Sequence, residues 1–363
     1  MNTPPAPSPL SASGRVAAAT GRLSRHLALA YAALIIYASL HPFSGWRDSA
    51  LSPFAFLEAG WPRYWTGFDL AINVFAYLPL GFLLTLALRQ LPTLLAAPTA
   101  LLLGTLLSFS MESLQGWLPS LVPSNLDFFT NTLGCAIGAL LALWLGHRVF
   151  RYIATLRYWL APGTHVEAGL VLVGLWLLTQ LSPETFLFGT GDLRHLLEIT
   201  PAVPYAPPSF LLIETAIVVC NTVAIGLVFF ALLVERKSSL VLLCTFLVLA
   251  LAIRALAAAI LVGPQQALVW LTPGAMLGLM IGGAALTLLL LPPLPWRIAF
   301  AGLALMAGTV LVNLTPPNPY SEAAMATWQQ GHFLNFNGLT RLTASLWPFL
   351  ALPYLMLAVR KKQ

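Results

Sequence analysis

The chain contains ten apolar segments, and most of them, as helices, would be about long enough to cross a bilayer. They lie at 26–42, 68–90, 94–115, 127–147, 167–187, 210–234, 239–262, 266–291, 296–315 and 336–359. A helix needs roughly 20 apolar residues to cross the hydrocarbon core. Only 8% of the residues are charged, whereas soluble domains carry about 25%, and the mean hydropathy is +0.83. The sequence therefore predicts an all-α integral membrane protein with about ten transmembrane helices.

The net charge of +6 is distributed as in a membrane protein. Basic residues gather in the two tails and in the connections that an even number of spans places on one side. They are Arg15, Arg22, Arg25, Arg148, Arg151, Arg157, Arg236, Lys237, Arg360, Lys361 and Lys362. Positive charge accumulates on the cytoplasmic side of membrane proteins, so both termini are expected in the cytoplasm. Basic patches interleaved with exposed aromatic residues, which indicate nucleic-acid binding, do not occur, and no nucleic-acid partner is expected.

An eroded internal repeat relates the two halves of the chain. The string Asp69-Leu-Ala-Ile matches Glu214-Thr-Ala-Ile at a shift of 145 residues. A GxxxG pattern recurs at a shift of 140, in the pairs Gly134 and Gly138, and Gly274 and Gly278. Repeats of this kind indicate structural units that recur along a chain.

The repeat divides the sequence into four predicted regions. A disordered cytoplasmic tail is expected over 1–25, followed by a four-helix unit over 26–150 and a degenerate second four-helix unit over 165–291. A partial third unit of two helices, ending in a basic cytoplasmic tail, is expected over 296–363. The predicted architecture is therefore two four-helix units plus a two-helix half unit.

Three polar pairs at helical spacing interrupt the apolar segments of the first unit. They are Asp69 and Asn73, Glu112 and Gln115, and Asp127 and Asn131. Residues three or four apart share one face of a helix. An ionisable group inside a membrane helix costs several kcal/mol unless it is paired or hydrated, so it indicates a functional site by default.

Each polar residue also has a structural interpretation. Asp127 and Asp69 stand at predicted helix starts, where a carboxylate can cap backbone donors. The amides of Asn73, Gln115 and Asn131 could be hydrogen-bonding contacts between helices. Glu112 is harder to explain in this way, because it lies about two turns inside its segment and forms a polar stripe with Ser108 and Gln115.

The later units supply two arginines at intramembrane depth, Arg254 and Arg341. Under the repeat, Arg254 falls opposite Glu112 and Arg341 falls near Asn73. Pairing with the acidic cluster is one interpretation. Snorkelling of each side chain to the interface is the other.

The motifs of the first unit resemble one known family. They are Ser39-Leu-x-Pro-Phe43, Asn73 with Pro79-Leu80-Gly81-Phe82, Glu112-x-x-Gln115, and Pro123-Ser124-x-x-Asp127-x-x-x-Asn131-Thr132-Leu133-Gly134-x-x-x-Gly138. Together they are similar to the VanZ-like family of bacterial membrane proteins, named for a member that lowers susceptibility to teicoplanin. The resemblance covers about 28–148 and implies a cell-envelope role in the bacterial inner membrane, linked in one relative to antibiotic resistance. Family members usually carry an arginine in the turn before the Asp-x-x-x-Asn string, where this chain has Leu121; Arg254 or Arg341 could substitute for it.

The leading functional hypothesis is a non-enzymatic envelope protein that binds an amphiphilic ligand at the polar cluster. A membrane lipid, a cell-wall lipid precursor or a lipoglycopeptide would suit such a site. One alternative is a transporter or flippase of a lipid-linked group, and another is an intramembrane enzyme that acts on an outer-leaflet lipid. The sequence contains no GxxxxGK[ST], HExxH or GxSxG motif, so no cofactor, metal or catalytic residue is expected.

Overall fold

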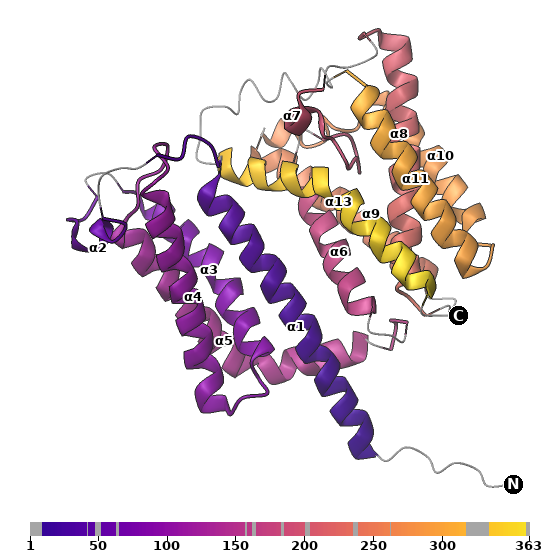
Figure 1. Cartoon of the computed structure of the whole chain (residues 1–363). Coiled ribbons are helices and arrows are strands. Elements are labelled where there is room, and N and C mark those ends of the chain that lie inside the picture. The colour runs from indigo at the N-terminus through magenta and orange to yellow at the C-terminus, as the bar shows by residue number, and fades with distance from the viewer. Residues whose placement is uncertain are drawn as a thin grey trace, which may run out of the picture. The chain divides into compact units, whose positions relative to one another are not determined.

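The computed structural model describes most of the chain as helix. The described residues are 9–41, 43–47, 52–62, 65–156, 158–161, 165–182, 185–199, 204–234, 239–261, 263–316 and 334–360. Within these ranges all the regular secondary structure is helical, and β-pairing is limited to one isolated bridge between Leu160 and Leu233. The chain divides into two compact units, 1–158 and 159–363 (Figure 1). The second unit therefore contains both the predicted second unit and the predicted half unit.

Unit 1 is built around the contact between two of its helices. Its helices are α1 (Pro9–Leu40), α2 (Ala55–Glu58), α3 (Gly67–Ala87), α4 (Thr93–Gln115) and α5 (Asn125–Leu156). The helix α3 packs most extensively on α5 and also contacts α1 and α4, while α4 packs on α5 (Figure 1). This arrangement places α3, α4 and α5 around a common interior.

Glycines allow the close approach of α3 and α5. A Cβ atom on Gly138 would lie 2.9 Å from the carbonyl carbon of Leu78, and one on Gly134 would lie 2.9 Å from the Cα atom of Val74. On the opposing helix, a Cβ atom on Gly81 would lie 2.8 Å from the Cα atom of Cys135. Real Cβ atoms do not approach backbone this closely, so only glycine fits. The GxxxG pattern is therefore a helix-packing face, as is common in membrane proteins.

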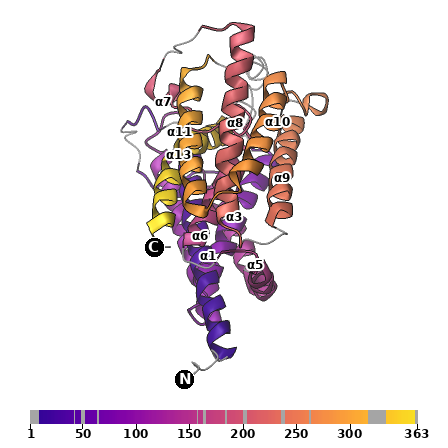
Figure 2. The same cartoon turned by 90° about the vertical axis from the view of Figure 1, so that its right-hand side faces the viewer.

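Unit 2 is built around a helix that is flanked on two sides. Its elements are α6 (His165–Thr179), α7 (Arg194–Leu197), α8 (Pro207–Ala231), α9 (Ser239–Leu261), the 3₁₀ turn η1 (Pro264–Gln266), α10 (Pro273–Leu289), α11 (Leu294–Leu314) and α13 (Leu334–Arg360). Figure 2 shows α8 between α10 and α11, both of which it contacts extensively. The helix α6 packs instead on α13.

The second GxxxG pattern packs as the first does. A Cβ atom on Gly274 would contact Glu214, and one on Gly278 would contact Val218, both on α8. In unit 1 the corresponding contacts are made with Val74 and Leu78, so glycines and partners share a shift of 140 residues. This correspondence supports the internal repeat, which stays a prediction.

Seven helices in the described part of the chain are long and apolar enough to cross a membrane. All ten predicted spans overlap helices, but three lie on helices outside those seven. The predicted span 167–187 ends early, because α6 stops at Thr179; the span 266–291 starts late, because α10 begins only at Pro273. The third, 336–359, lies on α13. At the N-terminus, helix α1 already begins at Pro9, upstream of the predicted boundary at residue 26.

The connection that follows α6 is partly buried within unit 2. The predicted spans 167–187 and 210–234 leave 188–209 as a connecting loop, and within it Phe188, Thr190 and Gly191 are buried. Their polar groups find partners there: the Thr190 hydroxyl donates to Asn221, and the Gly191 N–H donates to the Ala344 carbonyl at 2.8 Å. Buried non-helical backbone is tolerated where its polar groups are satisfied within the protein.

Trp347 ties α13 to α6 and provides a test of the unit 2 core. Its side chain is 1% exposed, and its indole N–H donates to the Leu172 carbonyl at 2.8 Å. We expect Trp347→Phe to destabilise the protein by about 1–2 kcal/mol, because the replacement loses this buried bond. The measurement is the thermal unfolding midpoint in detergent, with Trp296→Phe as the control, since Trp296 is 61% exposed. Equal midpoints for the two variants would contradict a stabilising role for the bond between Trp347 and Leu172.

Candidate functional site in unit 1

A polar cluster, buried except for half-buried Asn73 and Asp127, lies where α3, α4 and α5 meet. We define it by seven residues from the three helices and the turn before α5: Asn73, Tyr77, Ser108, Glu112, Ser124, Asp127 and Asn131. Ser108 is fully buried, Glu112 is 3% exposed and Asn131 is 6% exposed. Five of these seven residues belong to the predicted site, and the structure connects them through the contacts described below.

Glu112 holds the start of α5. Its Oε2 atom accepts a 2.8 Å hydrogen bond from the backbone N–H of Ser124. The Ser124 hydroxyl in turn accepts from the N–H groups of Leu126 and Asp127, at 3.2 and 3.3 Å, which caps the helix. A carboxylate on α4 thus fixes the turn that leads into α5.

Asp127 bonds across to another helix. Its Oδ1 atom accepts a 2.8 Å bond from the amide of Asn73 on α3. Asp127 also interacts electrostatically with Glu112, so the two carboxylates lie near each other within the cluster. Since Ser124 caps α5, the position of Asp127 near the start of its helix does not make it the capping residue.

Asp69 has a capping role. Its carboxylate accepts from the Thr66 N–H at 3.0 Å and from the Thr66 hydroxyl at 2.7 Å, while its own N–H donates to that hydroxyl. This reciprocal arrangement is a capping box at the start of α3. These contacts agree with the interpretation of Asp69 as a helix-capping residue.

The predicted amides connect neighbouring helices. Asn131 donates to the Ser108 hydroxyl at 3.1 Å, which joins α5 to α4. Gln115 donates to the Ser39 carbonyl at 3.0 Å, which joins α4 to the end of α1. Gln115 therefore lies outside the cluster although it shares a sequence motif with Glu112.

Tyr77 belongs to the cluster but is absent from the sequence prediction. It is 3% exposed and interacts electrostatically with Glu112. Its position four residues after Asn73 could have revealed it, because residues four apart share a helix face. In the described part of the chain, the Asn131 Oδ1 atom is buried without a hydrogen-bond partner, whereas the Tyr77 hydroxyl interacts with the Ser108 side chain. Unsatisfied buried polar atoms are costly and leave bonding capacity inside the cluster.

The two arginines of the predicted site belong to unit 2. Arg254 on α9 is 2% exposed and donates to the hydroxyl and carbonyl of Thr185. Arg341 is half-buried on α13. Pairing of either arginine with Glu112 stays a prediction. Over the described residues, the ion pair within unit 2 is that of Arg194 with Asp192, at 2.6 Å.

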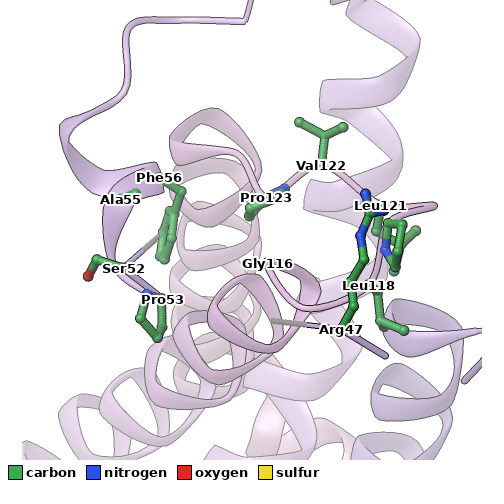
Figure 3. A pocket seen from close by; sticks show the side chains of 11 residues that line it. Arg47, Ser52, Pro53, Ala55, Phe56, Gly116, Leu118, Leu121, Val122 and Pro123 are labelled. Atoms are coloured by element: carbon green, nitrogen blue, oxygen red, sulfur yellow. The ribbon is translucent and has the colours of Figure 1, made fainter. Parts of the chain in front are cut away.

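A pocket of about 450 Å³ adjoins the turn that Glu112 anchors. Figure 3 shows the segment 52–56 on one side and Arg47 with Leu118 and Leu121 on the other. Leu121 stands where an arginine was expected from the family resemblance. The cation that lines this turn is Arg47, which comes from the loop after α1.

The donor set gives no indication of a metal centre. No group of three or more histidine, cysteine or acidic side chains converges within the described ranges. What the cluster offers is carboxylate, amide and hydroxyl groups. Such a set suits hydrogen-bond donors such as hydroxyl or amine groups.

These features define a polytopic helical membrane protein with a buried acidic and amide cluster in its N-terminal unit. Comparison with known families agrees with this class. Residues 16–146 match the family model described as VanZ/LLP1, so the chain carries a VanZ-like region that takes in most of unit 1. Comparisons with curated proteins and with solved structures returned no match.

Proposed function

We propose that the protein binds an amphiphilic ligand of the cell envelope at the polar cluster of unit 1. The observation that carries this proposal is the pair of carboxylates of buried Glu112 and half-buried Asp127. Within the described ranges neither forms an ion pair, and the Asn131 Oδ1 atom of the same cluster has no hydrogen-bond partner. An arrangement kept only for stability would favour apolar packing over such a cluster.

The ligand class follows from the surroundings. The helices that hold the cluster are apolar on their outer faces, where Leu102 and Leu140 are 58% and 65% exposed. A ligand that reaches the cluster therefore meets apolar surface outside and hydrogen-bond acceptors inside. A lipid-linked precursor or a lipoglycopeptide, with an apolar chain and hydroxyl or amine donors, has this character.

Two isosteric variants test the proposal with little change of structure. In Glu112→Gln the side-chain carbonyl can still accept from the Ser124 N–H, and in Asp127→Asn it can still accept from Asn73. Each variant therefore replaces the acidic group with an amide but keeps the bond that holds the fold. Glu58→Gln is the matched control, because Glu58 is exposed on α2.

The measurement is mass spectrometry of the amphiphiles that copurify with wild type and with each variant. We expect one envelope species to be retained by wild type and by Glu58→Gln, and to fall about tenfold in the two cluster variants, the effect of losing one hydrogen bond to the ligand. Equal retention by all four proteins would overturn the proposal. The same comparison on whole envelopes of cells that lack the gene separates the alternatives, since an enzyme changes a product and a transporter changes a distribution.

A further inference from the structure

We propose that the pocket beside the 116–123 turn binds the phosphate group of an anionic lipid, with Arg47 as the anion-binding residue. This inference deepens the proposed function and rests on it for the identity of the natural ligand. The binding chemistry itself is argued from the pocket.

The backbone that carries Arg47 is held in place. The Arg47 N–H donates to the Trp117 carbonyl at 3.0 Å, which fastens the loop to the turn. Phe43 and Gly45 take left-handed conformations, with φ of 59° and 78°. A left-handed conformation is unfavourable for a bulky residue such as Phe43. Residues with strained backbone cluster at sites where the protein positions a functional group.

The Arg47 side chain belongs to the lining of the pocket. The side chain is exposed at the pocket, and within the described ranges no carboxylate lies within ion-pair distance of it. Ser52 lines the opposite side of the pocket (Figure 3), and its hydroxyl accepts from the Phe54 N–H at 3.3 Å. Guanidinium and hydroxyl groups are standard partners of a phosphate group.

The remaining wall is apolar. Phe56 and Leu118 are 3% and 1% exposed beside the pocket, and Val122 is 82% exposed at its edge. Glu112 does not line the pocket, because its carboxylate bonds to Ser124 behind the turn. A cation in an apolar recess fits a phosphate that carries a hydrocarbon chain better than a free inorganic ion, since the chain can cover the apolar wall.

The experiment measures lipid binding to the purified full-length protein by native mass spectrometry. The probes are phosphatidylglycerol, phosphatidylcholine with the same acyl chains, and inorganic phosphate. The variants are Arg47→Ala and Arg47→Lys. Arg148→Ala is the matched control, because Arg148 is also an exposed arginine of unit 1 but lies on α5 over Trp144.

We expect wild type and Arg148→Ala to bind phosphatidylglycerol more tightly than phosphatidylcholine, and Arg47→Ala to weaken that binding by about tenfold. Arg47→Lys should recover part of it, because a point charge replaces a bidentate donor. Unchanged binding by Arg47→Ala, an equal loss in Arg148→Ala, or equally tight binding of inorganic phosphate would overturn the proposal. Loss of phosphatidylglycerol binding together with an unchanged copurifying species in Glu112→Gln would support the pocket while rejecting the proposed function.

Discussion

Gly138→Ala is expected to lower the thermal unfolding midpoint of the detergent-solubilised protein by several degrees. The added methyl group would overlap the backbone of Leu78 and lie 2.9 Å from the Phe82 nitrogen. Backbone cannot move aside as a flexible side chain can, so α3 and α5 must separate. Overpacking of this kind costs about 1–3 kcal/mol, and more where the displaced atoms belong to a second helix.

The matched control is Gly283→Ala. Gly283 also lies inside a helix, α10, but nothing lies within 4 Å of a Cβ atom built on it. There the substitution should be neutral or slightly stabilising, since alanine is favoured over glycine in helices by about 1 kcal/mol. If both substitutions shift the midpoint equally, the close packing of α3 on α5 is not what holds unit 1 together.

Arg254→Met is expected to cause the largest loss of stability in unit 2, about 3 kcal/mol. The guanidinium is almost fully buried and donates to the carbonyl of Thr185, which begins the buried non-helical segment. Methionine fills a similar volume but leaves the carbonyl without this donor, and a lost bond to a charged group is costly when it is buried. The segment should then open more often.

Limited trypsin digestion measures that opening directly. Arg194 lies just after the buried segment and is held by Asp192 and by the Thr315 carbonyl. We expect cleavage after Arg194 to accelerate in Arg254→Met and to stay unchanged in the exposed-site control Arg148→Met. Cleavage at the wild-type rate in Arg254→Met would contradict the role of Arg254 in holding the segment that begins at Thr185.

A double-mutant cycle decides whether Arg254 also serves Glu112, as the sequence suggests. If the two residues are paired, the stability losses of Arg254→Met and Glu112→Gln will be non-additive. If each acts within its own unit, the losses will add. The cycle requires no assumption about how the two units are arranged.

The sequence by itself determined the helical membrane class of the protein and predicted a helix at each apolar segment, but not where α1, α6 and α10 begin or end. Apolar length and the i, i+4 spacing of polar residues are local properties, so they predicted helices at all ten segments and the shared helix face of Glu112 and Ser108. The GxxxG packing face could also be predicted from local sequence, because two glycines four residues apart leave one side of a helix without side chains. The VanZ-like region, found from its motifs, is supported by the match over 16–146.

Only the tertiary structure decided what each polar group bonds to. Glu112 accepts from Ser124, twelve residues away, and Asp127 accepts from Asn73, fifty-four residues away. Such pairings depend on the crossing of separate helices, which no spacing within one helix specifies. The same reason explains why Arg47 was missed, and why part of the connection after α6 is buried: each acquires its environment from elements distant in the chain.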